Sequence, residues 1–320
     1  MTSYLDALVQ PRTRAEFMAA FAANQPFVVH GLTDSIAALT TLPFLASLNA
    51  LLNAWPFPVA AHLPDVADEA SSIDASTLDA RKLFDNGMGL LFNEAHLIAP
   101  ELQRWLGALR QELQLSALTQ SRCLVYATPK GKGTAPHFDQ NINFVLQLHG
   151  RKQWQLAANH HVESPLTRHT MGQVVDDELQ SYATLPMPSQ MPQDCQTIVL
   201  EPGSLLFVPR GTWHATHGFS DALSLNFTYS SPSWLDIFTT ALRSRLAMSS
   251  VWRETATPMN TEIFEQLLLE LAKEAPHWDA SEILAATESV DAAESPADGR
   301  DAVTTVNNLV SRNNHDKIFK

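Results

Sequence analysis

The chain has 320 residues, 45% of them hydrophobic and 17% charged, a balance typical of a globular protein rather than a disordered one. Its formal net charge of −13 argues against nucleic acid as a partner, because phosphate binding needs clustered Lys and Arg. The 2 cysteines cannot build a disulfide framework, whereas the 12 histidines offer imidazole for metal chemistry.

Residues 1–115 are predicted to form a mostly helical N-terminal flank. The sequence begins without a basic region followed by an apolar run, so we expect no signal peptide and a cytoplasmic protein. Residues 35–64 contain no charged side chain, but prolines and asparagines interrupt this stretch, which argues against a membrane span. Its apolar residues instead fall on one face of a helix that starts at Pro43. They are Phe44, Leu45, Leu48, Leu51, Leu52 and Trp55. A longer helical pattern follows over residues 99–113.

Residues 116–232 have a different texture, with short apolar runs separated by Gly, Pro and Asn. Several short strands without intervening helices predict an antiparallel sandwich or barrel. The predicted strands are Cys123–Ala127, Asn143–Leu148, Lys152–Leu156, Thr197–Leu200, Ser204–Val208 and Leu223–Tyr229.

Residues 233–320 return to a helical period. One apolar stripe begins at Trp234 and another covers residues 263–271, followed by a predicted linker over residues 291–300. The negative charge lies mainly in these flanks, because residues 254–301 carry 12 acidic and 2 basic side chains, whereas residues 115–235 carry 8 and 7.

Three His-x-Asp/Glu pairs are candidate metal ligands. A strand places residues i and i+2 on one face, so such a pair can direct an imidazole and a carboxylate at one point. With a second His from a neighbouring strand, this makes the facial triad that suits Fe(II). The pair His137 and Asp139 is favoured, because it lies between the turn-rich loop 130–136 and a predicted strand. The pair at 161 and 163 is expected in a solvated loop, and the pair at 277 and 279 between helices.

The second histidine is predicted from a separate motif. A buried strand over residues 204–208 leads through Pro209 and Gly211 to His214. This Gly-x5-Pro-x-Gly-x2-His pattern resembles the second motif of the cupin superfamily.

The resemblance is more specific over residues 137–154, which are similar to the JmjC-type cupin dioxygenases. Within this family, the segment is most similar to bacterial ribosomal oxygenases and to an asparaginyl hydroxylase. The resemblance covers about residues 134–229. It implies a double-stranded β-helix (cupin or jelly-roll fold) with helical flanks, and dependence on Fe(II), 2-oxoglutarate and O2. It also implies roles for single residues. His137, Asp139 and His214 are the implied iron ligands, Lys152 and Thr134 bind the distal carboxylate of 2-oxoglutarate, and Asn143 and Asn226 lie near cosubstrate and metal.

Lys152 has an independent physical argument. It follows the turn at Gly150, so its strand can return antiparallel beside the metal strand, and an inward Lys is costly unless it pairs with an anion. The alternative is an exposed strand Lys like its neighbour Arg151. For Asn226 the alternative is a buried amide that bridges strands, and Trp154 and Trp213 are predicted to be core aromatics.

These observations predict an Fe(II)/2-oxoglutarate-dependent hydroxylase. By resemblance its substrate is a side chain of a protein or peptide, with a small amino-acid-like metabolite or an N-methyl-lysine as alternatives. A non-enzymatic cupin binding module, a structural Zn site, and a cupin enzyme without a cosubstrate also stay open. We expect no nucleic acid and no membrane as partners, and a homodimer formed through the C-terminal helices.

Overall fold

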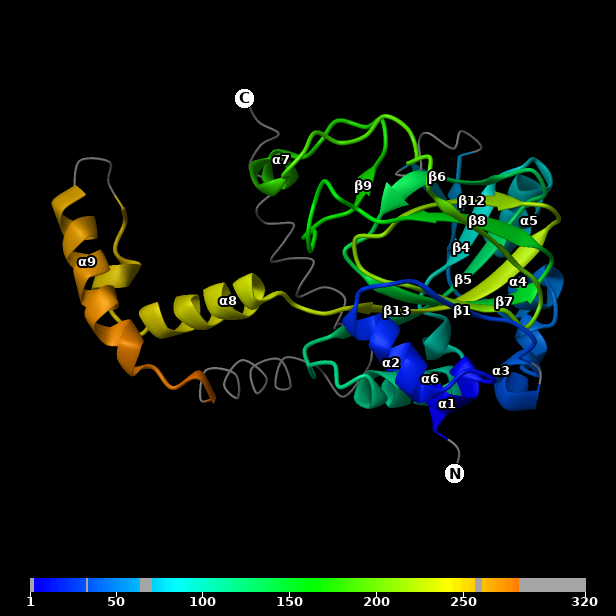
Figure 1. Ribbon diagram of the computed structural model, residues 1–320, viewed down its shortest axis with the longest axis horizontal. Helices are drawn as coiled ribbons and strands as arrows, with labels where there is room; N and C mark the ends of the chain where they lie inside the picture. The colour runs from blue at the N-terminus through cyan, green and yellow to red at the C-terminus, as the bar shows by residue number, and fades with distance from the viewer. Residues whose placement is uncertain (1–2, 33, 64–70, 257–260, 282–320) are drawn as a thin grey trace. The chain divides into compact units, whose positions relative to one another are not determined.

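Two antiparallel sheets form the centre of the fold in a computed structural model, which describes residues 3–32, 34–63, 71–256 and 261–281 (Figure 1). The larger sheet has the strand order β1-β11-β7-β13-β5-β4-β2-β3 and the smaller one β10-β8-β12-β6-β9. Eight strands, four in each sheet, make up the predicted double-stranded β-helix, and the chain passes from one sheet to the other at each step except between β8 and β10. In the larger sheet these are β5 (Gln120–Thr128), β7 (Ile142–His149), β11 (Leu205–Val208) and β13 (Ala222–Ser230). In the smaller sheet they are β6 (Gly133–Phe138), β8 (Lys152–Ala157), β10 (Gln196–Leu200) and β12 (Trp213–Gly218).

The N-terminal flank is less helical than its sequence pattern suggests, because it also extends the larger sheet at both edges. The added strands are β1 (Phe27–Val29), β2 (Val59–His62), β3 (Ser72–Ala75) and β4 (Gly89–Phe92). They are three or four residues long, too short to show a clear alternation in the sequence. This flank and the β core belong to one compact unit, residues 1–231.

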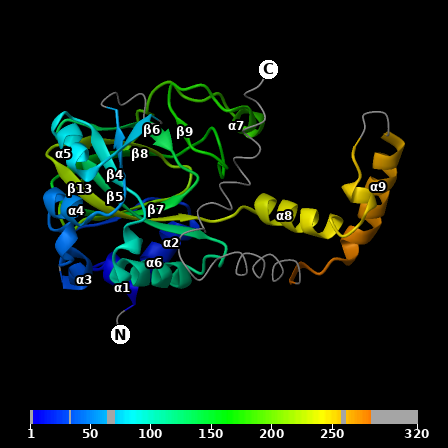
Figure 2. The ribbon, with the colours of Figure 1, turned by 180° about the vertical axis from the view of Figure 1, so that it is seen from behind.

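Helices of the flank lie against the larger sheet (Figure 2). They are α1 (Tyr4–Val9), α2 (Arg14–Ala22), α3 (Ala37–Thr40), α4 (Leu48–Ala54), α5 (Thr77–Asp85) and α6 (Pro100–Glu112). The helix predicted from Pro43 is interrupted, since Ser47 caps α4 through its side chain after a separate 3₁₀ turn. Phe17 of α2 packs on Phe144 and Phe207 of the sheet, with ring centroids 5.6 and 5.3 Å away. The main hydrophobic core therefore lies between this sheet and the flank.

Strand β6 occupies a segment that the sequence predicts as a loop. Gly133 and Pro136 are poor strand formers, but β6 pairs with β12, and a Cβ at Gly133 would lie 1.8 Å from the carbonyl oxygen of Thr216. Only glycine fits this close approach. His137 consequently lies near the end of a strand, and not at the start of one as predicted.

The segment between β8 and β10 carries the two-residue strand β9 (His169–Thr170) and helix α7 (Asp177–Tyr182). A small apolar cluster supports this segment, in which Leu179 packs with Phe138 and Trp213.

The second unit, residues 232–320, contains α8 (Trp234–Leu246) and α9 (Thr261–Glu274) among its described residues. Neither helix has a buried residue. The linker predicted over residues 291–300 lies outside the described residues. Across the described chain, no helix combines the length and the apolar character that crossing a membrane requires.

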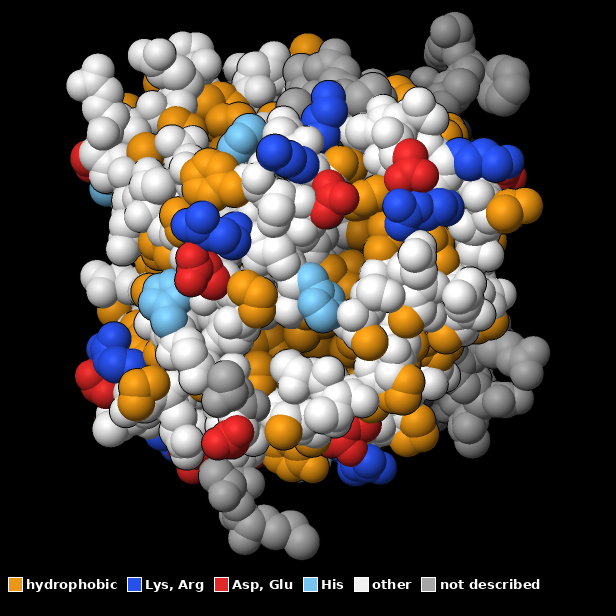
Figure 3. Space-filling view, turned by 90° about the vertical axis from the view of Figure 1, so that its right-hand side faces the viewer, with side chains coloured by type: hydrophobic (Ala, Val, Ile, Leu, Met, Phe, Trp, Pro, Cys, Tyr) orange, Lys and Arg blue, Asp and Glu red, His pale blue; other side chains and the backbone are white. Residues whose placement is uncertain are grey.

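One face of the molecule shows how its surface charge is arranged. In Figure 3, Lys and Arg side chains lie next to Asp and Glu side chains, and basic groups do not gather into a continuous patch on this face. This arrangement agrees with the low proportion of basic residues in the sequence.

Candidate metal centre

Paired strands bring the two predicted histidines together. His137 of β6 lies directly opposite His214 of β12 in the antiparallel register, and their ring centroids are 4.0 Å apart. Asp139 follows the end of β6, where its backbone carbonyl accepts a hydrogen bond from the N–H of Gly211 at 2.8 Å. The turn that precedes His214 thus also fixes the backbone that carries the carboxylate.

Hydrogen bonds determine which nitrogen of each imidazole is available. Nδ1 of His137 lies 2.7 Å from the carbonyl oxygen of Ala135, and Nδ1 of His214 lies 2.9 Å from that of Thr212. A carbonyl oxygen only accepts, so each Nδ1 carries the proton and each Nε2 presents a lone pair. Backbone carbonyls orient metal-ligating histidines in this way.

The three candidate ligand atoms converge without bonding one another. Oδ2 of Asp139 lies 3.9 Å from Nε2 of His137 and 3.7 Å from Nε2 of His214, distances that are too long for hydrogen bonds. Among the residues that the structure describes, His137, Asp139 and His214 are the only such group, with ligand atoms all within 4.8 Å of one another. Two neutral imidazoles and a carboxylate fit a divalent cation of the first transition series.

Burial keeps both imidazoles neutral. It lowers the pKa of His137 well below its ordinary value, and the neighbouring His214 and Arg168 lower it further. The pKa of His214 is also lowered, mainly by burial, although the Asp139 carboxylate opposes the shift. Both rings are therefore ready to bind a metal without first losing a proton.

The two competing His-x-Asp/Glu pairs do not make such a group within the described ranges. His277 lies in a 3₁₀ turn, and Asp279 accepts hydrogen bonds from the backbone N–H and the hydroxyl of Ser281. This is the geometry of a local turn rather than of a metal ligand.

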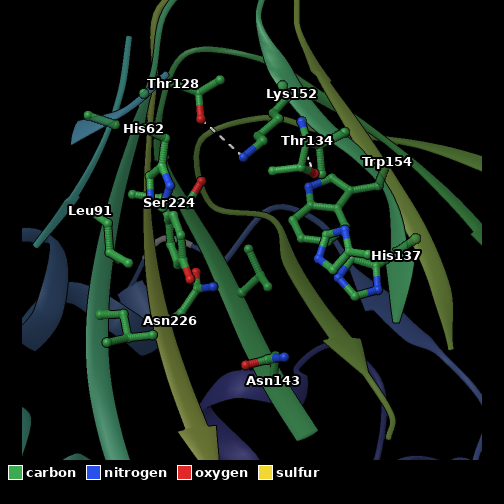
Figure 4. Close-up of a pocket in the computed structure, with 18 of the residues that line it drawn as sticks. His62, Leu91, Thr128, Thr134, His137, Asn143, Lys152, Trp154, Ser224 and Asn226 are labelled. Carbon is green, nitrogen blue, oxygen red and sulfur yellow. Dashed lines mark hydrogen bonds between the residues drawn. The ribbon is translucent and has the colours of Figure 1, made fainter. Parts of the chain in front are cut away.

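A cavity of about 310 Å³ extends from the triad between the two sheets. Lys152 of β8 points into it and is only 4% exposed, in contrast to the preceding residue, Arg151, whose side chain is 56% exposed. Nζ of Lys152 donates a hydrogen bond of 3.1 Å to Oγ1 of Thr128, and Figure 4 shows these two side chains pointing toward each other. The cavity thus has a cationic group at a distance from its metal end.

Thr134 lines the same cavity from β6. Its hydroxyl lies 2.8 Å from the hydroxyl of Thr216 on the neighbouring strand β12. Together with Thr128 and Lys152, these hydroxyls surround the part of the cavity suited to a carboxylate.

The two predicted asparagines belong to the larger sheet and line the cavity wall opposite Lys152 and Thr134 (Figure 4). Oδ1 of Asn143 accepts a hydrogen bond of 2.6 Å from the hydroxyl of Thr228. Oδ1 of Asn226 is buried and has no hydrogen-bond partner among the described residues. Because a buried polar atom without a partner costs free energy, this orphaned oxygen fits a cavity that takes a polar ligand.

The two tryptophans differ in their surroundings. Trp213 is fully buried in the small apolar cluster, as expected for a core aromatic. Trp154 belongs to a core cluster too, but it also lines the cavity and stacks on the ring of His214 with an interplanar angle of 23°. It therefore packs against a candidate ligand.

Sequence reasoning missed several cavity residues, of which Thr128 and Arg168 are the most relevant to the chemistry. Thr128 is the last residue of β5 and only its contact with Lys152 distinguishes it. Arg168 lies in a segment with no apolar periodicity, and its Nε is 3.2 Å from Oδ1 of Asp139. Neither residue belongs to a motif in the sequence, so only the folded chain reveals them.

Comparison with known proteins gives a family and two groups of relatives. The sequence model described as "JmjC domain" matches residues 103–237. The uncharacterized protein YxbC of Bacillus subtilis (strain 168) is 32% identical over 260 residues, which are 79% of this chain and 79% of that protein. Ribosomal oxygenase 1 of Danio rerio is 40% identical over 119 residues, which are 35% of this chain and 19% of that protein. This chain therefore spans about a fifth of that relative's length.

Among solved structures, YcfD, a ribosomal oxygenase from Escherichia coli in complex with cobalt and 2-oxoglutarate, matches with a TM-score of 0.50. It is 14% identical, and the match covers 83% of this chain and 68% of that one. At this identity the likeness concerns the fold.

Proposed function

The chain belongs to the JmjC-type oxygenase family, and from this premise we propose that it is an Fe(II)- and 2-oxoglutarate-dependent hydroxylase acting on a side chain of a protein or peptide. One observation carries the proposal. The neutral Nε2 atoms of His137 and His214 and a carboxylate oxygen of Asp139 converge at one end of a cavity that also holds the buried cation of Lys152.

The metal, 2-oxoglutarate and O2 supply the oxidising power when bound, since oxidative decarboxylation yields succinate and CO2 while one oxygen atom goes to a substrate C–H bond. The chain itself supplies binding and orientation. Asp139 and the two histidines would hold the cation, and three ligands of this type leave coordination positions for 2-oxoglutarate and O2.

Lys152 binds the distal carboxylate of 2-oxoglutarate, with the hydroxyls of Thr134 and Thr128 as further hydrogen-bond partners. The ammonium group is already desolvated and positioned by Thr128, so little side-chain entropy is lost when the anion binds. Asn226 and Asn143 offer amide groups to the ligands nearest the metal.

The protein or peptide substrate is inferred from the relatives, which include ribosomal oxygenases and a bifunctional lysine-specific demethylase and histidyl-hydroxylase of Dictyostelium discoideum. Hydroxylation of a protein side chain is preferred here over demethylation. Both reactions use the same ligands around the metal, so the reaction product distinguishes them.

The test is a turnover screen of the purified chain. It is loaded anaerobically with Fe(II), supplied with 2-oxoglutarate and O2, and offered peptide pools and ribosomal protein extracts. We expect succinate formation that substrate stimulates and a 16-dalton gain on a protein or peptide. Release of formaldehyde would transfer the proposal to demethylation, and a 16-dalton gain confined to small metabolites would exclude a protein substrate.

The same experiment distinguishes the proposed enzyme from a binding module and from a protein with a structural Zn site. Such a protein forms no succinate above the level of its Asp139→Ala variant. Turnover without 2-oxoglutarate would instead indicate a cupin enzyme that needs no cosubstrate.

We propose further that the chain forms a homodimer through its C-terminal helices. Large apolar side chains of α8 and α9 are exposed, among them Phe238 at 52% and Phe264 at 56%, and surfaces of this kind mark protein contacts. Sedimentation analysis is expected to give a dimer for the full chain and a monomer for the double variant Phe238→Glu/Phe264→Glu. The control Leu78→Glu alters a residue of α5 that is more accessible, at 72% exposed, and is expected to remain dimeric.

A further inference from the structure

Arg168 lies opposite the metal-binding carboxylate because of a short piece of strand pairing. Strand β9 pairs antiparallel with β6, with Thr170 opposite His137 and His169 opposite Phe138. One more step in this register places Arg168 opposite Asp139. Its Nε accordingly lies 3.2 Å from Oδ1 of Asp139.

The two oxygens of the Asp139 carboxylate therefore face different groups. Oδ2 lies toward the two histidines, at 3.9 and 3.7 Å from their Nε2 atoms, while Oδ1 lies against Arg168. A carboxylate without such a neighbour can rotate or bind a cation through both oxygens. A guanidinium whose Nε lies 3.2 Å from Oδ1 holds the group in one orientation.

We infer that Arg168 is a positioning residue that keeps Asp139 a one-oxygen metal ligand directed at the histidine pair. This inference rests on the metal site of the proposed function. It adds a fourth side chain to the candidate centre, one that contacts the carboxylate but not the cation.

The segment that delivers Arg168 is itself anchored. Arg210 donates hydrogen bonds from Nε and Nη2 to the carbonyl oxygen of Pro165, at 2.9 and 2.6 Å. Arg210 immediately precedes Gly211, whose N–H binds the backbone of Asp139. The loop carrying Arg168 and the backbone carrying Asp139 are thus fixed on the same turn, although the Arg168 side chain is 35% exposed.

Charge and positioning predict opposite effects on metal binding, which makes the inference testable. A guanidinium near the site repels a dication, so if only its charge mattered, removing it would strengthen metal binding. If Arg168 orients the carboxylate, removing it weakens binding, because groups that orient metal ligands typically contribute about 10–100-fold to metal affinity.

The experiment is a titration of the metal-free full chain with Co(II), followed by visible absorption. Arg168→Met is expected to bind Co(II) about 10–100-fold more weakly than the unaltered chain and to change the shape of the d–d bands. Arg168→Lys keeps the charge but loses the planar fork, and is expected to lie between the two. The matched control Arg151→Met removes an exposed arginine immediately before β8 and is expected to bind as the unaltered chain does.

Thermal unfolding without metal separates positioning from folding, since Arg168→Met is expected to unfold at the same temperature as the unaltered chain. If that variant does not fold, the comparison of Arg168→Lys with Arg151→Met decides in its place. Equal or tighter Co(II) binding by Arg168→Met, with unaltered bands, overturns the inference and leaves the proposed function intact. A failure of the unaltered chain to bind Co(II) overturns both.

Discussion

Helices α6 and α8 have the same length, 13 residues, and both repeat apolar residues at helical spacing, yet they are used differently. Helix α6 buries four side chains, Leu102, Trp105, Leu106 and Leu109, against the larger sheet, and the hydroxyl of Tyr229 donates a hydrogen bond to its backbone. Helix α8 buries none. An apolar stripe therefore predicts a helix, but it does not predict what the helix packs against.

The two units also differ in the surroundings of their His-x-Asp pairs. The same His-x-Asp spacing occurs in both, and within the described residues only the pair His137 and Asp139 has a second histidine, His214 on the neighbouring strand, close enough to complete a ligand group. We expect Asp139→Ala to lower substrate-stimulated succinate formation more than about 100-fold, because it removes a metal ligand. Asp279→Ala is the matched control and should leave the rate unchanged. Equal loss in both variants would contradict the assignment of the site to the β core.

The two helices provide the next comparison, through a tryptophan in each. Trp105 of α6 is 3% exposed and Trp234 of α8 is 77% exposed. Trp105→Ala is expected to lower the free energy of unfolding by about 3–5 kcal/mol, the usual cost of deleting a buried aromatic. Trp234→Ala is expected to change it by less than about 0.5 kcal/mol. Urea unfolding at low protein concentration measures both values.

Repeating the unfolding measurements at higher protein concentration distinguishes the two helices further. If α8 contributes to the proposed dimer, the effect of Trp234→Ala grows as the concentration rises, whereas that of Trp105→Ala stays constant. Equal effects of the two substitutions in dilute solution would contradict the burial that distinguishes the helices.

Two neighbouring basic residues, Lys152 and Arg151, are expected to differ in their effect on 2-oxoglutarate binding. Lys152→Met removes a buried charge that is expected to pair with 2-oxoglutarate, at a cost of about 2–5 kcal/mol, or at least about 30-fold in affinity. Arg151→Met removes a charge exposed on the other face of the same strand end and should leave the affinity unchanged. Calorimetric titration of the Co(II)-loaded chain with 2-oxoglutarate measures both. Weakened binding in both variants would indicate a general effect of net charge.

The smallest expected effect concerns pH. Burial lowers the pKa of His96 to about 4, and Arg122 adds to the shift. Because the unfolded chain binds this proton near pH 6.5, the stability that neutral His96 contributes is complete above pH 6.5 and is lost as the pH falls toward 4. The change is about 2–3 kcal/mol.

His96→Gln is the variant that tests this. Glutamine retains an acceptor for the backbone N–H of Cys123, which now bonds Nδ1 of His96 at 3.3 Å, but it does not titrate. The difference in unfolding free energy between the unaltered chain and the variant is therefore expected to shift by about 2–3 kcal/mol in the variant's favour from pH 7 to pH 4. Parallel curves over this range would contradict the lowered pKa.

The grouping of His137, Asp139 and His214 and the inward position of Lys152 could be predicted, because both depend on short spacings within strands and turns. His137 and Asp139 are two residues apart, and the turn at Gly211 presents His214. Strands β6 and β12 were not predicted. Strand β6 contains Gly133 and Pro136, so its pairing with β12 stabilises it rather than the strand propensity of its own residues.

Arg168 lay beyond prediction for a related reason. Its position depends on β9, which has two residues, and on the register of that strand with β6. No periodicity can appear in two residues, and strands β7 and β8 separate Arg168 from Asp139 along the chain, so only the fold brings the two side chains together. Likewise, the apolar stripe of α8 predicts a helix, but it does not predict that none of its side chains is buried.

The close approach at Gly133 has a consequence for the lifetime of the protein. His137 and His214 belong to the two strands that meet there, so under the proposed function a cation bound by both would cross-link these strands. Ion occupancy and strand pairing would then be linked by mass action, each stabilising the other. A shortage of the metal would lower the resistance of this sheet to opening, and with it the survival of the chain against proteolysis.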